Sequence, residues 1–266
     1  MSAGRPERLR ILLTNDDGIN AEGLVALERI AAVLSDDVWV CAPEYEQSGA
    51  SRALTLSDPI RVRTLSERKF STTGTPTDCV MLALTELMGG LRPDLVLSGV
   101  NRGANLAEDV TMSGTVAGAI EGMALGVPSI ALSQTGGLEP QEPFYAPAEA
   151  FAPGIIKRLV AIGWPKDVIL NLNFPNRPVA EIDQVEVTRQ TFRDVHVRHA
   201  EKRTDLRNND YYWMGYRPER SHPEPGTDLA AIYEGKISVT PLHIDLTHLE
   251  TVHSLRKVLG GAPPRA

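Results

Sequence analysis

Apolar residues recur in two alternating patterns along the first 175 positions of the chain. Short, almost continuous apolar runs are typical of buried strands, whereas the spacing of Leu24, Leu27 and Ile30 is typical of an amphipathic helix. Strands that alternate with helices predict a doubly wound, mostly parallel sheet covered on both faces, a Rossmann-like α/β fold in three αβα layers. The expected strands are residues 10–14, 38–42, 94–98, 129–133 and 168–172, and the expected helices are residues 21–34, 77–88, 116–125 and 148–162.

Two further β-like runs, residues 60–64 and 69–72, fall between the second expected strand and the second expected helix. We expect these runs to form an excursion outside the main sheet. Near the other end of the chain, residues 236–240 predict a late strand and residues 246–259 predict a terminal helix.

The pattern changes after Pro175. Residues 180–225 mix charges of both signs, have no helical period and contain Tyr211, Tyr212 and Trp213 in a row. We interpret this segment as a β-rich arm that protrudes and packs against a partner subunit, the alternative being a long, partly ordered insertion. The expected organisation is a single α/β domain over residues 1–266, with its core at 9–175, a protruding oligomerisation segment at 180–235, and a C-terminal strand and helix at 236–259.

Composition excludes several classes of function. The 34 acidic and 27 basic residues leave a net charge of −7, which is opposite in sign to the basic surface that binds nucleic acids. Two cysteines, Cys41 and Cys79, are too few for a disulfide framework or a zinc cluster. No apolar run reaches the length of a membrane span, and we expect no signal peptide. These observations predict a cytoplasmic protein without nucleic-acid or membrane partners.

The first expected strand ends in two adjacent carboxylates, Asp16 and Asp17, followed by Gly18. Ligands of α/β sheets bind at the carboxyl ends of strands, and neighbouring carboxylates repel each other unless a cation lies between them. Mg²⁺ and Mn²⁺ carry that charge and prefer oxygen ligands. The residues alone leave a second interpretation open, in which Asp16 caps the next helix while Asp17 and Gly18 form a turn.

Two later strand ends offer further ligands. The loop after the second strand contains Ser48 and Gly49, and a small hydroxyl beside a glycine can approach a metal or a phosphate closely, although this loop by itself is ordinary. Beyond residues 94–98, Asn101 offers a neutral amide oxygen to a divalent cation. Arg102 is a candidate for holding a phosphate and is equally well explained as a solvated surface residue.

Two expected helices begin with residues suited to capping or to phosphate binding. Thr75 precedes Pro76, and plain capping is the favoured interpretation of that pair. Ser113, Gly114 and Thr115 open a helix of small residues that can pack close to the sheet. The free amides and the positive dipole at the start of such a helix form a natural phosphate site.

These candidate residues lie in five short stretches, namely residues 14–18, 42–51, 74–79, 98–103 and 113–116. The same stretches occur in the same order and with similar spacing in a known family. On these residues the chain resembles the SurE family, survival-protein nucleotidases that are metal-dependent phosphatases of nucleoside monophosphates. The later half is similar more loosely, at residues 171–175 and 239–242.

The resemblance implies which residues act together. The implied ligands of one divalent cation per subunit, Mg²⁺ or Mn²⁺, are Asp16, Asp17, Ser48 and Asn101. The implied or candidate contacts to phosphate and substrate are Asn15, Gly49, Arg102, Ser113, Gly114 and Thr115.

The resemblance also implies hydrolysis of nucleoside monophosphates, of the 5′ kind, the 3′ kind or both, with short polyphosphate as a further candidate substrate. Our mechanistic hypothesis takes Asp16 and Asp17 as the catalytic residues. The attacking group is either water at the cation, which we favour, or a carboxylate, with Asp17 the candidate, that forms a phospho-enzyme. The implied assembly is a homodimer or homotetramer that exchanges C-terminal segments.

Three other classes of protein share parts of this pattern. A receiver domain needs a phospho-acceptor aspartate at its third strand end, where this chain offers Ser98 and Asn101. A phosphatase of the haloacid-dehalogenase type needs two aspartates separated by one residue, whereas Asp16 and Asp17 are adjacent. The alternative to an enzyme is a non-catalytic module that senses nucleotide or phosphate on the same scaffold.

Overall fold

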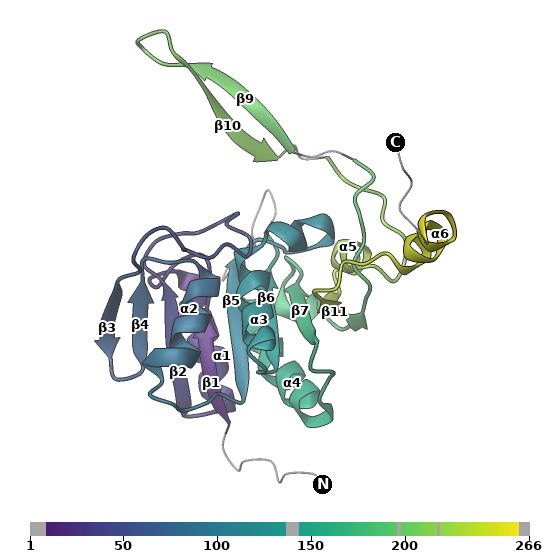
Figure 1. The fold of residues 1–266 in the computed structure, drawn as a ribbon. Helices are drawn as coiled ribbons and strands as arrows, with labels where there is room; N and C mark the ends of the chain where they lie inside the picture. The colour runs from purple at the N-terminus through teal and green to yellow at the C-terminus, as the bar shows by residue number, and fades with distance from the viewer. Residues whose placement is uncertain (1–8, 137–143, 196–197, 217–218, 261–266) are drawn as a thin grey trace.

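The computed structural model describes residues 9–136, 144–195, 198–216 and 219–260 of the chain. Its main body is a nine-stranded sheet with helices on both faces (Figure 1). Only two neighbouring pairs of strands in this described sheet are antiparallel, which confirms the predicted, mostly parallel α/β fold. The strands of the sheet are β1 (Arg10–Thr14), β2 (Asp37–Pro43), β3 (Val62–Ser66), β4 (Lys69–Thr72), β5 (Leu95–Arg102), β6 (Ser129–Gln134), β7 (Val168–Phe174), β8 (Val185–Val187) and β11 (Ile237–His243).

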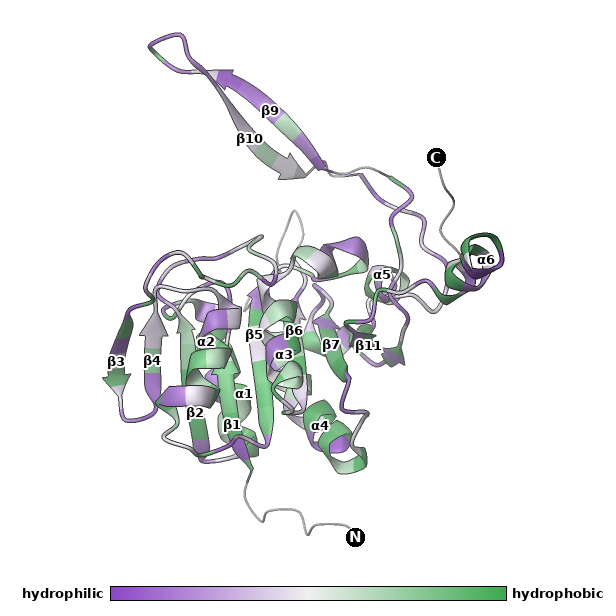
Figure 2. Ribbon diagram, in the orientation of Figure 1, coloured by the Kyte–Doolittle hydropathy of each residue, from purple (hydrophilic) through white to green (hydrophobic). Residues whose placement is uncertain are grey.

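The two faces of the sheet bury alternate residues of the same strand. On β1, Ile11 and Leu13 pack into one apolar cluster, and Leu12 packs into another on the opposite face. The central strands are accordingly coloured as hydrophobic in Figure 2. The helices on the first face are α1 (Glu22–Leu34) and α4 (Ala146–Ile162), and those on the second are α2 (Pro76–Leu82) and α3 (Gly114–Ala124).

The β-like runs at residues 60–64 and 69–72 extend the main sheet, so the predicted excursion was wrong. β4 pairs in parallel with β2, and β3 pairs antiparallel with β4. Phe70 of β4 is buried and stacks on Trp39 of β2, with 6.4 Å between the ring centroids. This long-range apolar contact favours pairing at the sheet edge, and the short runs themselves carry no sign of it.

The second predicted helix is divided in two. α2 ends at Leu82, and Ala83–Leu87 continues it as a π-helical turn. At the start of α2, the hydroxyl of Thr75 accepts from the backbone N–H of Asp78 at 3.2 Å, while the Asp78 carboxylate accepts from the backbone N–H of Thr75 at 2.9 Å. This capping box confirms the capping interpretation of Thr75.

The C-terminal part of the chain leaves the sheet and returns to its far edge. β9 (Arg198–Thr204) and β10 (Asp210–Tyr216) form a separate antiparallel hairpin that projects away from the sheet (Figure 1). α5 (Asp228–Tyr233), which the sequence pattern did not predict, packs against β11, and α6 (Leu249–Leu259) follows. Among the described helices, none has the length and apolar character needed to cross a bilayer.

The order of strands reverses beside β1. The sheet runs β3-β4-β2-β1-β5-β6-β7-β11-β8, so the chain adds β2 on one side of β1 and later adds β5 on the other. Such a switch point opens a crevice at the carboxyl ends of the strands. Thr14 at the end of β1 lies opposite Ser98 of β5, and the residues that follow these two positions therefore meet at one edge.

Candidate metal and phosphate site

Asp16 lies at the bottom of this crevice and is only 4% exposed. The Thr115 hydroxyl donates to its Oδ1 at 2.5 Å. The first residue of α3, Gly114, lies so close that an added Cβ would meet Asp16 Oδ2 at 2.9 Å and Asp16 Cβ at 2.7 Å. The start of α3 therefore fixes the orientation of this carboxylate, and a side chain at position 114 would displace it.

Both members of the acid pair have raised pKa values. Burial raises the pKa of Asp16 from 3.8 to about 6, and the charge of Asp17 adds to this effect while the hydrogen bond from Thr115 opposes it. Burial also raises the pKa of Asp17, where the charge of Glu46 adds to the effect and the Arg102 backbone N–H, which donates to Oδ2 at 3.2 Å, opposes it. A cation between the two carboxylates would offset both the cost of burying their charges and the repulsion between them.

The loop after β2 places Ser48 beside the acid pair. The backbone N–H of Gln47 donates to the carbonyl of Asp16 at 2.8 Å. Further along the loop, Arg52 forms an ion pair with Glu121 of α3 at 2.7 Å. The loop is thus attached both to the end of β1 and to α3. The Ser48 hydroxyl donates to Glu46 at 2.8 Å, which keeps its lone pairs available to a cation.

A bulge in β5 places Asn101. The register with β6 shifts between Ser98 and Asn101, and Gly99 adopts a φ of +135° within this bulge. The Asn101 side-chain amide donates to the carbonyl of Gly103 at 2.9 Å. Its amide oxygen is therefore the atom available to a cation.

One cavity of about 330 Å³ gathers six of the predicted site residues in its wall. They are Asp16, Ser48, Gly49, Asn101, Arg102 and Ser113. An adjacent chamber of about 260 Å³ is lined by Asp17 and again by Ser48 and Arg102. Residues from four separate parts of the chain thus converge on one hollow at the switch point.

Three other predicted residues lie behind the cavity wall. Asn15 is fully buried, its side-chain amide donates to the carbonyl of Gly18 at 2.9 Å, and its Oδ1 has no hydrogen-bond partner among the described atoms. Thr115 is also fully buried, and its hydroxyl donates a hydrogen bond to Asp16. Gly114 packs against the same carboxylate. In this structure these residues hold Asp16 and the turn after it.

Asn105, which is not among the predicted site residues, also lines the cavity. Its backbone N–H donates to Asn173 Oδ1 at 2.9 Å, and its side-chain amide donates to Ser133 at 2.8 Å. These buried bonds attach the loop after β5 to β6 and β7. The sequence does show a second asparagine four residues after Asn101. Its role could not be predicted, because the residues that hold Asn105 lie 28 and 68 positions away in the sequence.

The donor set fits one hard divalent cation. It combines two carboxylates with a hydroxyl and an amide oxygen, the ligand types that Mg²⁺ and Mn²⁺ accept. Within the described ranges, no Lys, Arg or His forms an ion pair with Asp16 or Asp17. The described residues also contain no group of three or more His, Cys, Asp or Glu placed so that it could hold a metal ion.

Fold and site together define an α/β protein with a paired-carboxylate site at the switch point of a doubly wound sheet. The family model described as "Survival protein SurE" matches residues 11–197. The protein named 5′-nucleotidase SurE of Phenylobacterium zucineum (strain HLK1) is 79% identical over 257 residues, which cover 97% of this chain and 100% of that protein. The chain belongs to the SurE family.

Two further proteins agree with this assignment. The 5′-nucleotidase SurE of Caulobacter vibrioides (strain NA1000 / CB15N) is 69% identical over 259 residues, covering 97% of this chain and 98% of that protein. The crystal structure of the SurE protein from Aquifex aeolicus superposes with a TM-score of 0.81 at 38% identity, covering 94% of this chain and 99% of that one. The shared architecture therefore extends over nearly the whole chain.

Proposed function

We propose that this chain is a nucleotidase that hydrolyses nucleoside 5′- and 3′-monophosphates to nucleoside and phosphate, and also acts on short polyphosphate. Asp16, Asp17, Ser48 and Asn101 hold one Mg²⁺ or Mn²⁺ in each subunit. The observation that carries the proposal is the convergence of two carboxylates and two neutral oxygen donors on two adjoining cavities beside the start of α3. The names of the curated relatives support the same class of reaction.

The cation, when bound, supplies polarisation of a phosphoryl oxygen and neutralises charge as the ester oxygen departs. The chain supplies the remaining electrostatic stabilisation. The first amides of α3 point the positive end of a helix dipole at the cavity, where Ser113 forms part of the wall. Arg102 and Gly49 line the same cavity, one offering a guanidinium and the other close approach of its backbone. These groups stabilise the equatorial phosphoryl oxygens.

Asp17 is the residue that we assign to the attacking group. Its Oδ2 accepts the Arg102 backbone N–H, so Oδ1 is the oxygen available to orient a water molecule and to accept its proton. Asp16 is more deeply buried and is held by Thr115, which suits a residue that keeps a fixed geometry. Attack by the Asp17 carboxylate itself, through a phospho-enzyme, is the second route.

The alternative of a non-catalytic sensing module is not favoured. Such a module needs a phosphate-binding helix start and has no need for four converging oxygen ligands, and the relatives are named as enzymes. We also propose that the protein acts in the cytoplasm, because its two cysteines are too few for the disulfide framework typical of secreted proteins.

Phosphate release from a panel of nucleoside monophosphates tests the proposed function. We expect a chelator to lower the rate by at least about a hundredfold, and Mg²⁺ or Mn²⁺ to restore it, because charge at the phosphoryl group is no longer neutralised without the cation. The control is the same panel with a chelator selective for Ca²⁺ while Mg²⁺ is held constant. This treatment is expected to leave the rate unchanged. Nucleotide binding without turnover under any metal would instead support the sensing module.

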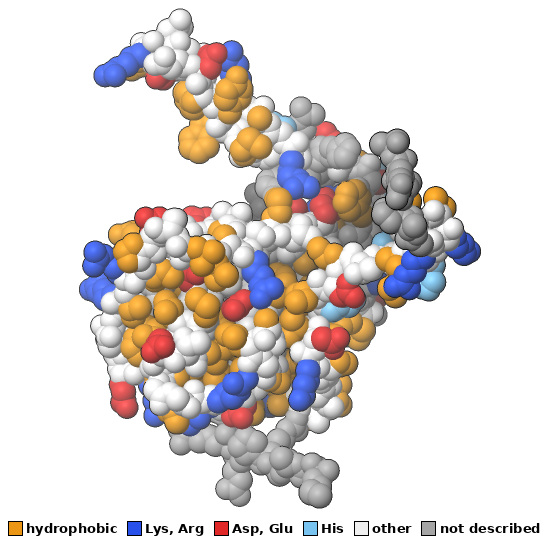
Figure 3. Space-filling view, in the orientation of Figure 1, with side chains coloured by type: hydrophobic (Ala, Val, Ile, Leu, Met, Phe, Trp, Pro, Cys, Tyr) orange, Lys and Arg blue, Asp and Glu red, His pale blue; other side chains and the backbone are white. Residues whose placement is uncertain are grey.

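We also propose that the protein is a homodimer or homotetramer that exchanges its C-terminal segments. The β9–β10 hairpin carries exposed aromatic and apolar side chains, among them Tyr212, Trp213 and Met214. Figure 3 shows hydrophobic side chains on the surface of this projecting arm. Exposed apolar surface on a projecting element is typical of an interaction site. α6 adds the exposed side chains of Leu249 and Val258.

Sedimentation velocity at micromolar concentration measures this assembly. We expect a dimer or tetramer for the wild type and a shift toward smaller species for Trp213→Glu, because a charge in an apolar contact is costly. The matched control is Ile162→Glu, which introduces the same charge at an exposed apolar residue at the end of α4, outside the hairpin. A monomeric wild type would contradict the proposal.

A further inference from the structure

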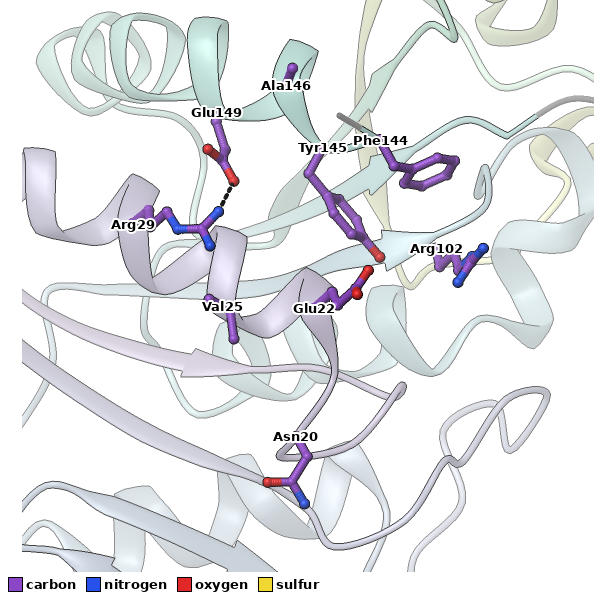
Figure 4. A pocket seen from close by; sticks show the side chains of 9 residues that line it. All are labelled: Asn20, Glu22, Val25, Arg29, Arg102, Phe144, Tyr145, Ala146 and Glu149. Carbon is purple, nitrogen blue, oxygen red and sulfur yellow. Dashed lines mark hydrogen bonds and ion pairs between the residues drawn. The ribbon is translucent and has the colours of Figure 1, made fainter. Parts of the chain in front are cut away.

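A larger hollow adjoins the site on the side of α1 and the start of α4 (Figure 4). Its volume is about 470 Å³, within the range of roughly 300–1,000 Å³ found for small-molecule sites. Glu22, Arg102 and Tyr145 line both this hollow and the small chamber that contains Asp17, so the two spaces are neighbours. The catalytic crevice therefore continues into a cleft that the proposed chemistry does not use.

One wall of this cleft is aromatic and cationic. The rings of Phe144 and Tyr145 meet edge to face, with 5.0 Å between centroids and an interplanar angle of 83°. The guanidinium of Arg102 lies 5.5 Å from the centroid of the Phe144 ring. A flat aromatic surface beside a planar cation suits a heteroaromatic base, which stacks on either group.

A carboxylate lies between this wall and the acid pair. Glu22 is the first residue of α1, and Figure 4 shows its carboxylate and the hydroxyl end of Tyr145 directed toward one another. Elsewhere in the lining, Arg29 forms an ion pair with Glu149 at 2.6 Å, whereas Glu22 has no ion-pair partner within the described part of the chain. A carboxylate in such a position accepts hydrogen bonds from the hydroxyls of a ribose.

We propose that this cleft is the nucleoside subsite, in which Glu22 accepts the ribose hydroxyls and the base lies against Phe144 and Arg102. The order of the spaces supports this assignment. The metal site, the small chamber with Glu22 and the larger aromatic hollow follow one another, as phosphate, ribose and base do in a nucleoside 5′-monophosphate. The inference rests on the proposed function and adds which residues recognise the ribose and the base of the substrate.

Three phosphomonoesters separate the parts of this subsite: adenosine 5′-monophosphate, ribose 5-phosphate and phenyl phosphate. We expect Glu22→Gln to raise KM about tenfold for the first two and to leave phenyl phosphate unchanged, because only the ribose hydroxyls lose a charged acceptor. We expect Phe144→Ala to raise KM about tenfold for adenosine 5′-monophosphate alone, because only that substrate carries a base.

A matched control is Glu67→Gln, which removes one exposed carboxylate in the turn between β3 and β4 and is expected to change no KM. Equal changes for all three esters in Glu22→Gln would overturn the subsite, because they would mark a general effect of charge on the metal site. An unchanged KM for adenosine 5′-monophosphate in both variants would also overturn it.

Calorimetric titration with adenosine separates this inference from the proposed function. We expect the wild type to bind adenosine and Phe144→Ala to bind it about tenfold more weakly. A wild type that hydrolyses none of the esters but binds adenosine in this way would contradict the nucleotidase and support the subsite. A wild type that hydrolyses phenyl phosphate and adenosine 5′-monophosphate with equal KM, and does not bind adenosine, would keep the phosphatase and overturn the subsite.

Discussion

Replacing Asp16 with asparagine is expected to lower kcat/KM for a nucleoside monophosphate roughly a thousandfold, because it removes a charge from the proposed cation site. The amide oxygen still accepts the Thr115 hydroxyl, which now donates to Asp16 at 2.5 Å, so the geometry of the start of α3 is retained. Steady-state phosphate release with Mg²⁺ or Mn²⁺ measures the loss. A rate near that of the wild type would contradict the assignment of Asp16.

The same substitution is expected to stabilise the protein in the presence of a chelator. A carboxyl group with a higher pKa in the folded than in the unfolded state favours folding while it is protonated. For Asp16 that contribution disappears as the pH rises from about 3.8 to about 6. Above pH 6 the charged, buried carboxylate costs up to about 3 kcal/mol, and asparagine removes this cost.

Thermal unfolding in chelator at pH 8 and pH 4 checks the effect on stability. We expect Asp16→Asn to unfold at a higher temperature than the wild type at pH 8, and the two to be similar at pH 4. Asp167→Asn, at an exposed position before β7, serves as the matched control. A variant that is less stable than the wild type at pH 8 would show that the buried charge of Asp16 does not destabilise the folded protein.

Replacing Gly114 with alanine is expected to lower kcat/KM roughly a hundredfold, because a shift of about 1 Å in a catalytic group has an effect of this size. An added Cβ would lie 2.7 Å from Asp16 Cβ and 2.9 Å from its Oδ2, so either the carboxylate or α3 has to move. We also expect the variant to need a higher concentration of Mg²⁺ for half-maximal rate. Titration of the rate with Mg²⁺ measures both effects.

Gly154→Ala in α4 is the matched control for this substitution. An added Cβ at Gly154 meets no atom within 4 Å, so the helix gains up to about 1 kcal/mol from the better helix former and the rate stays unchanged. Activity of Gly114→Ala within twofold of the wild type would contradict the close contact between α3 and Asp16.

Local pattern was sufficient for much of the central fold. β1 and β4 have the bounds that their apolar runs predict, and α1 begins one residue later than predicted. The acid pair, Ser48 and Asn101 could be selected as candidates because each follows a predicted strand, and in α/β sheets such positions share one edge. The structure extends the third of these strands, β5, to Arg102, so Asn101 lies inside it, after the bulge. These inferences need only the period of the apolar residues and the chemistry of the residues that interrupt it.

The edges of the sheet could not be predicted in the same way. The strand runs at β3 and β4 were recognised, but their place in the sheet depends on the contact between Phe70 and Trp39, which are 31 positions apart in sequence. α5 was missed because its six residues are too few for a helical period to appear.

The sequence by itself therefore determined the alternation of strands and helices, the chemistry of the candidate ligands and the family. Only the tertiary structure decided how those ligands are held and what surrounds them. The sequence does not show which residue a glycine at the start of a helix contacts. In the structure Gly114 packs against Asp16, which lies 98 positions earlier. The cleft likewise joins Glu22 to Arg102 and Tyr145, which come from distant elements. Close packing of such residues arises from long-range contacts, and the local periodicity of a chain carries no record of them.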